Sequence, residues 1–184
     1  MKKVKFLTIS IFAIALFASC SDDDVPETVL PQEVITTLRL TLEPEGGGTD
    51  IVLEYLDLDA DGPNPPVVIV SGNLAAGTSY NGTILLLNET VNPPENVTEE
   101  VDEENLEHQF FYTIGGDLNV TTEYENFDTD GNPLGTELML STGEASSGTL
   151  TLTLRHEPNK PNSGLADAGG ETDIEVTFDV AVVD

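Results

Sequence analysis

Strict alternation of apolar and polar residues is the feature that most limits how this chain can fold. Residues 37–42 and 149–154 place a leucine at every second position, and residues 173–180 alternate polar or acidic side chains with branched and aromatic ones. A period of two puts successive side chains on opposite faces of a β-strand, whereas an amphipathic helix needs apolar residues three and four apart. The pattern therefore predicts strands with one buried and one solvated face.

Turn-forming residues divide the chain into nine strand candidates, which are 37–42, 50–57, 67–71, 79–88, 108–114, 117–126, 135–141, 149–154 and 173–180. Only residues 96–107 have a helical pattern, with Asn96 as a candidate N-cap and acidic residues in the first turn. About nine strands with polar outer faces predict an all-β fold, an antiparallel β-sandwich or barrel-like domain of immunoglobulin-like type.

The N-terminal residues have the architecture of a secretory signal. A basic start at residues 1–5 precedes an apolar run at 6–17, which is too short for a permanent membrane span. Residues 16–20 resemble a lipobox, in which the cysteine thiol is acylated and becomes the new N-terminus, although Phe17 replaces the usual aliphatic residue. This resemblance implies a signal peptide at 1–19 and lipidation of Cys20, the only cysteine. An ordinary signal peptide with a chance cysteine is the alternative.

Residues 20–33 read as a tether between the lipid and a single domain at 34–184. Residues 21–24 are Ser-Asp-Asp-Asp, and the prolines of 25–31 exclude a helix or a central strand. An acidic run directly after the lipidated cysteine resembles the surface-export signal of Bacteroidota lipoproteins. That resemblance implies an outer-membrane protein anchored by lipid and facing the cell exterior, with the periplasmic face as the alternative.

The charge of the chain excludes one class of partner. The chain has 34 acidic and six basic residues, and three of the basic ones lie in the signal peptide. The mature protein would then carry three basic against 34 acidic residues, a formal charge of −31. Such a field repels nucleic acid and concentrates cations, so we expect no nucleic-acid partner.

Three stretches resemble a family of small flavobacterial lipoproteins, namely residues 35–38, 107–112 and 154–161. The resemblance extends over the mature domain. This uncharacterised family often carries the label "type 1 periplasmic binding fold superfamily". That fold requires alternating strands and helices in a parallel sheet, whereas this sequence predicts almost no helix. The resemblance therefore implies a compartment and a family, but no activity.

The two histidines are the candidate ligands for a transition metal. If the strands alternate in direction, then the segments 57–62, 89–107, 128–132 and 156–161 all lie at one end of the domain. Strand register further places His108 and His156 on core-facing positions at that end. Imidazole suits zinc or copper, and Glu157, Asp57, Asp128 or Asp130 would add a carboxylate. The alternative is that both histidines are rim residues bonded to neighbouring acids.

A calcium site is a separate prediction. Asp57, Asp59, Asp61 and Gly62 match the first half of a calcium loop, but Val68 stands where an EF-hand has its glutamate, and prolines exclude the following helix. Asp128 or Asp130 would have to supply the missing oxygen. The alternative is that aspartate-rich turns are ordinary loop chemistry on an acidic surface.

No catalytic motif accompanies these candidates: the chain has no Gly-x-Ser-x-Gly, phosphate-binding loop or His-Glu-x-x-His. We therefore expect a non-enzymatic, lipid-anchored surface protein that binds cations (Ca²⁺, Zn²⁺ or Cu²⁺) as an accessory to metal or nutrient uptake, with a TonB-dependent outer-membrane receptor as a partner. The alternative is a structural or adhesive surface module whose aspartate loops are stiffened by calcium.

Overall fold

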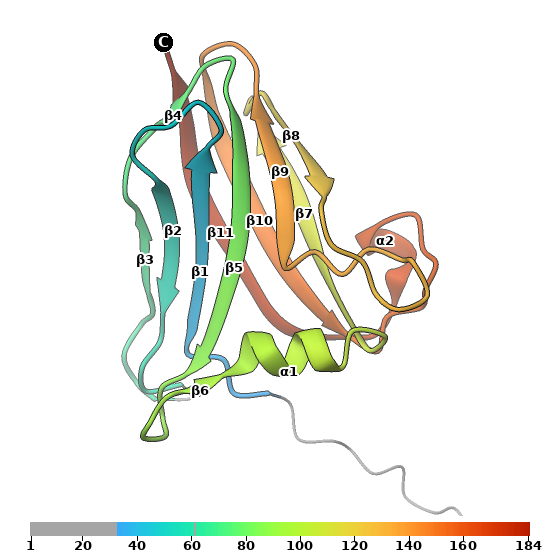
Figure 1. Ribbon diagram of the computed structural model, residues 1–184. Helices are drawn as coiled ribbons and strands as arrows, with labels where there is room; N and C mark the ends of the chain where they lie inside the picture. The colour runs from blue at the N-terminus through green and yellow to red at the C-terminus, as the bar shows by residue number, and fades with distance from the viewer. Residues whose placement is uncertain (1–32, 61) are drawn as a thin grey trace, which may run out of the picture. The chain divides into compact units, whose positions relative to one another are not determined.

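Two β-sheets face each other across one apolar core in the computed structural model, which describes residues 33–60 and 62–184 (Figure 1). The larger sheet has the order β3–β2–β1–β5–β9–β8, with β6 paired to β5, and the smaller has the order β4–β11–β10–β7. All pairs are antiparallel except β4 with β11. Of the residues that the structure describes, 52% are in strands and 7% in helices, so the expected all-β fold is confirmed.

The larger sheet consists of β1 (Thr37–Pro44), β2 (Ile51–Leu56), β3 (Val67–Val70), β5 (Ser79–Asn88), β6 (Glu95–Asn96), β8 (Val120–Tyr124) and β9 (Glu137–Thr142). The smaller consists of β4 (Leu74–Ala75), β7 (His108–Gly116), β10 (Ser146–His156) and β11 (Glu171–Val183). The two strands beyond the nine expected are β4 and β6, which have two residues each.

The core forms where the alternating leucines of the two sheets meet. Leu38, Leu40 and Leu42 of β1 are completely buried, and so are Leu150, Leu152 and Leu154 of β10. Burying one such side chain contributes about 1.5–3 kcal/mol, and truncating one to alanine costs roughly 2–5 kcal/mol. The period-two pattern thus produces the packing that holds the sheets together.

Two helices lie at one end of the sandwich (Figure 1). Helix α1 (Val97–Glu103) falls within the expected helical segment, and its Val97 and Val101 are buried in the core. Asn96 is its N-cap residue, but the amide donates to the Glu99 carboxylate and does not cap the helix. Helix α2 (Leu165–Ala168) is a single turn that the sequence did not predict. No helix in the described residues is long and apolar enough to cross a membrane.

Strand neighbours do not follow chain order, but strand directions do alternate. β1 pairs with β2 and β5, while β10 pairs with β7 and β11, so the chain crosses between sheets. The connections after β2, β5, β8 and β10 nevertheless gather at the end that carries α1 and α2, and the short turns gather at the opposite end (Figure 1). The sequence-based placement of the unusual loops at one end therefore agrees with the structure.

Candidate metal centre

The two histidines lie side by side at the helical end of the smaller sheet. His108 begins β7 and His156 ends β10, and the antiparallel register pairs them directly. Their rings stack with centroids 4.8 Å apart and planes 29° apart. The His108 side chain is fully buried, and that of His156 is 15% exposed. The structure thus brings together the two residues that loop direction and register had placed at one end.

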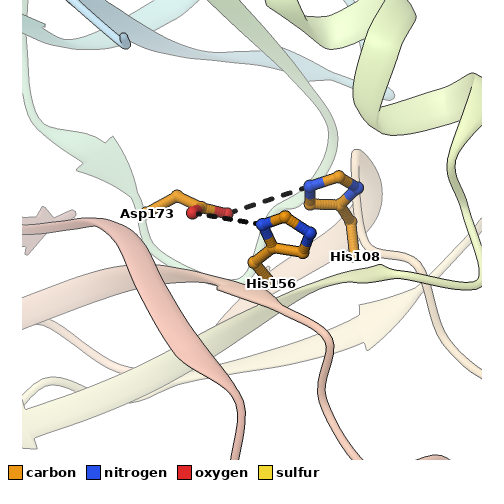
Figure 2. Close-up of side chains that lie close together, drawn as sticks. All are labelled: His108, His156 and Asp173. Carbon is orange, nitrogen blue, oxygen red and sulfur yellow. Dashed lines mark ion pairs between the residues drawn. The ribbon is translucent and has the colours of Figure 1, made fainter. Parts of the chain in front are cut away.

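A carboxylate from the neighbouring strand faces both rings (Figure 2). Asp173 Oδ2 lies 3.9 Å from His108 Nε2, and Asp173 Oδ1 lies 3.9 Å from His156 Nδ1. The Asp173 side chain is only 1% exposed. The alternation of residues 173–180 predicted that Asp173 would lie on the outer face with the other acids of β11, and this was wrong.

A β-bulge is the reason that Asp173 is buried. Leu154 of β10 pairs with Ile174 and Arg155 pairs with Thr172, so Asp173 is an extra residue between two regular pairs. An extra residue re-aims its side chain relative to the regular alternation. Because the bulge depends on how two strands pair, the alternation within β11 gave no signal for it.

Glu33 is a further carboxylate beside His108, and it forms a group of potential ligands with His108 and Glu104, separate from the group of His108, His156 and Asp173. Its Oε1 atom lies 3.3 Å from His108 Nε2, and its side chain is 14% exposed. The sequence assigned Glu33 to the tether, so this contact was missed, and nothing in residues 20–33 distinguishes it from the other acids. We call His108, His156, Asp173 and Glu33 the inner cluster.

The hydrogen bond at the other nitrogen of His108 orients the ring. His108 Nδ1 lies 3.3 Å from the backbone carbonyl of Glu104, in the turn after α1. A carbonyl only accepts, so this contact requires a proton on Nδ1 and directs Nε2 toward Glu33 and Asp173. Nε2 is buried and makes no hydrogen bond among the described residues.

Burial and charge shift two pKa values in the inner cluster. Burial, the largest influence, and the charge of Glu33 raise the pKa of Asp173 from 3.8 to about 6, although both imidazoles oppose the shift. For His108, burial is again the largest single influence and lowers the pKa. The contact with Glu33, the Glu104 carbonyl and Asp173 together outweigh burial, so the pKa of His108 is raised above 6.5. The cluster therefore holds protons close to neutral pH.

No protein-family model, curated protein or solved structure matches this chain. The chemistry of its side chains therefore carries the functional argument.

Glu157, expected as a third metal ligand, lies on the solvent side of His156. It forms a second group with Glu107 and His156, in which one ligand atom from each residue lies within 4.8 Å of the others. His156 Nε2 is 3.9 Å from Glu107 Oε2, and both glutamates are exposed. His156 thus faces the inner cluster through Nδ1 and this outer group through Nε2.

Two carboxylates of the expected calcium loop accept hydrogen bonds from nearby side chains. Asp57 accepts a hydrogen bond from the Tyr55 hydroxyl (3.1 Å), and Asp59 accepts one from the Asn64 side chain (2.6 Å). Asp61 lies outside the described residues. Neither Asp57 nor Asp59 belongs to any of the described groups of three or more His, Cys, Asp or Glu residues that could share an ion.

The second pair of aspartates is not beside the first. Asp57 follows β2, whereas Asp128 and Asp130 follow β8, and β1, β5 and β9 lie between these strands in the sheet. Asp128 belongs to none of the described groups of potential ligands, either with Asp57 or with the histidines. Its carboxylate accepts from the backbone amides of Asp130 and Asn132 and from Lys160 Nζ (3.1 Å). The structure therefore gives no support for one calcium site that combines these loops, and that site stays a prediction.

Lys160 joins three connections at the helical end. Its ammonium donates to the carbonyls of Asn105 (2.7 Å) and His108 (2.5 Å) as well as to Asp128. Burial is the largest influence on its pKa and lowers it, while Asp128 opposes the shift. The His108 backbone is thus fixed by Lys160, and its ring by the Glu104 carbonyl.

The remaining site prediction, lipidation of Cys20, lies outside the described residues.

Proposed function

We propose that this protein is a lipid-anchored cell-surface protein that binds one transition-metal ion, Zn²⁺ or Cu²⁺, through His108, His156 and Asp173. One observation carries the proposal: the buried Nε2 of His108 faces two carboxylates and makes no hydrogen bond among the described residues.

Electrostatics requires a cation at that position. With its proton on Nδ1, His108 presents a lone pair at Nε2 to the oxygens of Glu33 and Asp173, which are also acceptors. Acceptors facing one another in a buried site repel each other, and either a proton or a metal ion relieves the repulsion. The raised pKa values of His108 and Asp173 describe the proton-bound form of the same site.

The spacing of the ligand atoms suits a small ion. With metal–ligand bonds of about 2.0–2.1 Å, neighbouring ligands at a tetrahedral zinc lie roughly 3.3 Å apart. The ligand atoms of His108, His156 and Asp173 lie within 4.8 Å of one another, with N–O separations of 3.9 Å, so movements of up to about 1.5 Å would close them around zinc. A histidine that donates from one nitrogen to a carbonyl and binds metal through the other is also the usual arrangement in protein sites.

The ligand types also set selectivity. Calcium and magnesium take oxygen ligands, six to eight of them for calcium, whereas imidazole nitrogen suits zinc and copper. The many surface carboxylates would concentrate any divalent cation near the protein without selecting one. The histidines would then be the source of selectivity.

The role that we propose is carriage and not catalysis. A metal held by buried side chains on three adjacent strands has little room for a substrate, whereas catalytic zinc sites keep an open position. A lipid anchor at Cys20 would hold the protein at the outer membrane, and a TonB-dependent receptor would take the metal onward as an accessory step of uptake.

Calorimetric titration of metal-free protein tests the proposal. We expect one Zn²⁺ per chain, with affinity that is unchanged by excess Ca²⁺ or Mg²⁺. Loss of a second-shell partner typically costs 10–100-fold in affinity, so His108→Gln and His156→Gln should each cost more than about 100-fold. The double variant should be little weaker than either single one, because the ligands act as a unit.

Copper provides a readout that surface carboxylates cannot imitate. The chain has only two histidines, so imidazole nitrogen couplings in the paramagnetic resonance spectrum of the Cu²⁺ form report on them alone. We expect two imidazole nitrogens in the wild type and one in each single variant. Zinc binding that ignores both substitutions would place the metal on surface carboxylates and refute the proposed site.

A further inference from the structure

Glu33 lies where the chain enters the domain, three residues before Thr36. Thr36 is completely buried and joins the larger sheet, because its amide donates to the Leu87 carbonyl (2.9 Å) and its carbonyl accepts from the Asp57 amide (2.7 Å). The histidines and Asp173 belong to the smaller sheet. The carboxylate of Glu33 therefore reaches from the end of a central strand of one sheet to His108 of the other.

The position and burial of the Glu33 carboxylate suit a metal ligand. Its Oε1 atom is the closest carboxylate oxygen to His108 Nε2 in the described ion pairs, at 3.3 Å against 3.9 Å for Asp173. Its Oε2 atom is buried and makes no hydrogen bond among the described residues. Burying a carboxylate oxygen without a partner is costly, and a metal ion would supply that partner.

We propose that Glu33 is the fourth ligand of the inner cluster, so that metal binding fastens the entry segment of the chain to the smaller sheet. This inference rests on the proposed function, because it assumes a metal at His108, His156 and Asp173. Glu33 groups within 4.8 Å with His108 and Glu104 and not with His156 and Asp173, so its side chain would move toward them on metal binding. Two imidazoles and two carboxylates would then give a closed, four-coordinate shell, which is the usual form of a zinc site that holds its ion without reacting.

The consequence is a link between metal occupancy and the segment that joins the domain to its tether. Without metal, Glu33 is held by its contact with His108 and by the backbone bonds of Thr36. With metal, a coordination bond replaces this contact, and residues 33–36 open less often. Metal occupancy would thus reduce local opening of residues 33–36, where the tether joins the domain.

The test compares Glu33→Gln with Glu107→Gln in the full mature chain. Both substitutions remove one negative charge beside a histidine, since Glu107 Oε2 lies 3.9 Å from His156 Nε2. Glu107 is half exposed and faces the outer side of His156, so its variant measures the effect of charge alone. We expect Zn²⁺ affinity to fall by a factor of 10–100 for Glu33→Gln and by less than about threefold for Glu107→Gln.

Hydrogen exchange provides the second readout. Zn²⁺ should slow exchange at the amides of residues 33–36 in the wild type and in Glu107→Gln, but not in Glu33→Gln. Glu33→Asp keeps the charge and shortens the side chain, so it should lose both affinity and protection if ligation is the cause. It should behave like the wild type if charge alone is the cause, which would overturn the inference.

The outcomes separate the two proposals. Unchanged affinity and unchanged protection in Glu33→Gln, with Zn²⁺ still bound through the histidines, would overturn the role of Glu33 and leave the proposed function intact. Absence of zinc binding by the wild type would overturn the proposed function itself. Circular dichroism of each variant without metal shows that a lost affinity is not a lost fold.

Discussion

Replacing Asp173 by asparagine should make the metal-free protein more stable at pH 8 while abolishing tight zinc binding. Asp173 is buried beside Glu33, and its pKa is about 6 instead of 3.8. One pKa unit corresponds to 1.36 kcal/mol, so keeping this carboxylate ionised in the folded state costs roughly 3 kcal/mol. Asparagine has no charge to bury but keeps a polar side chain, so we expect a gain of about 1–3 kcal/mol.

The size of the effect changes with pH in a defined window, and its sign stays the same. Below pH 3.8 the carboxyl is protonated in both the folded and unfolded states, so the substitution changes no charge. Between pH 3.8 and about 6 the unfolded chain loses its proton while the folded protein keeps it, and the stability of the wild type falls. Above about pH 6 the difference is constant. The advantage of Asp173→Asn should therefore grow from near zero at pH 4 to its full value by pH 7.

Urea unfolding in the presence of a chelator measures this difference at each pH. The whole protein is strongly acidic, so general charge repulsion also increases with pH. Asp179→Asn, an exposed position on the same strand, is the control for that contribution. A wild type that is as stable as Asp173→Asn at pH 8 without metal would refute the reasoning, because the carboxylate would then be stabilised by its surroundings.

Three further predictions follow from the same structure. Zn²⁺ at 100 times its dissociation constant should stabilise the wild type by about 2.7 kcal/mol at pH 8, and thermal melts should show this gain vanishing toward pH 5 as His108 and Asp173 take up protons. Lys160→Met should lower the free energy of unfolding in urea by about 3–5 kcal/mol, because it leaves Asp128 without its cation. Adding Asp128→Asn should recover part of this loss. A Lys160→Met variant as stable as the wild type would contradict the prediction. Cys20→Ala should leave an unlipidated precursor, and continued uptake of labelled fatty acid by that variant would exclude the anchor.

The period-two pattern was sufficient to predict the fold because each strand is specified locally. The leucines of residues 37–42 and 149–154 point inward as their alternation requires, and loop direction follows from antiparallel pairing alone. Strand neighbours were not predictable in this way, since β1 pairs with β5 and β7 pairs with β10 across long stretches of chain. That is why no local pattern showed that three strands separate β2, which precedes Asp57, from β8, which precedes Asp128.

The candidate site was predicted only in part, for the same reason. His108 and His156 occupy regular positions, so their register showed that they face the interior. Asp173 is buried only because of a bulge that involves two strands, and Glu33 approaches only because the entry segment folds against the other sheet. Both carboxylates depend on long-range pairing, which local patterns do not encode.

The bulge at Asp173 would also make the proposed metal binding separable from folding in evolution. Deleting this one residue would let Thr172 and Ile174 continue the regular ladder opposite Arg155 and Leu154, with no change to the leucine core. The result would be a shorter and more regular sandwich that lacks the buried carboxylate. A single-codon insertion or deletion could thus give or remove the site in one step, so chains with the same architecture can differ in whether they bind metal.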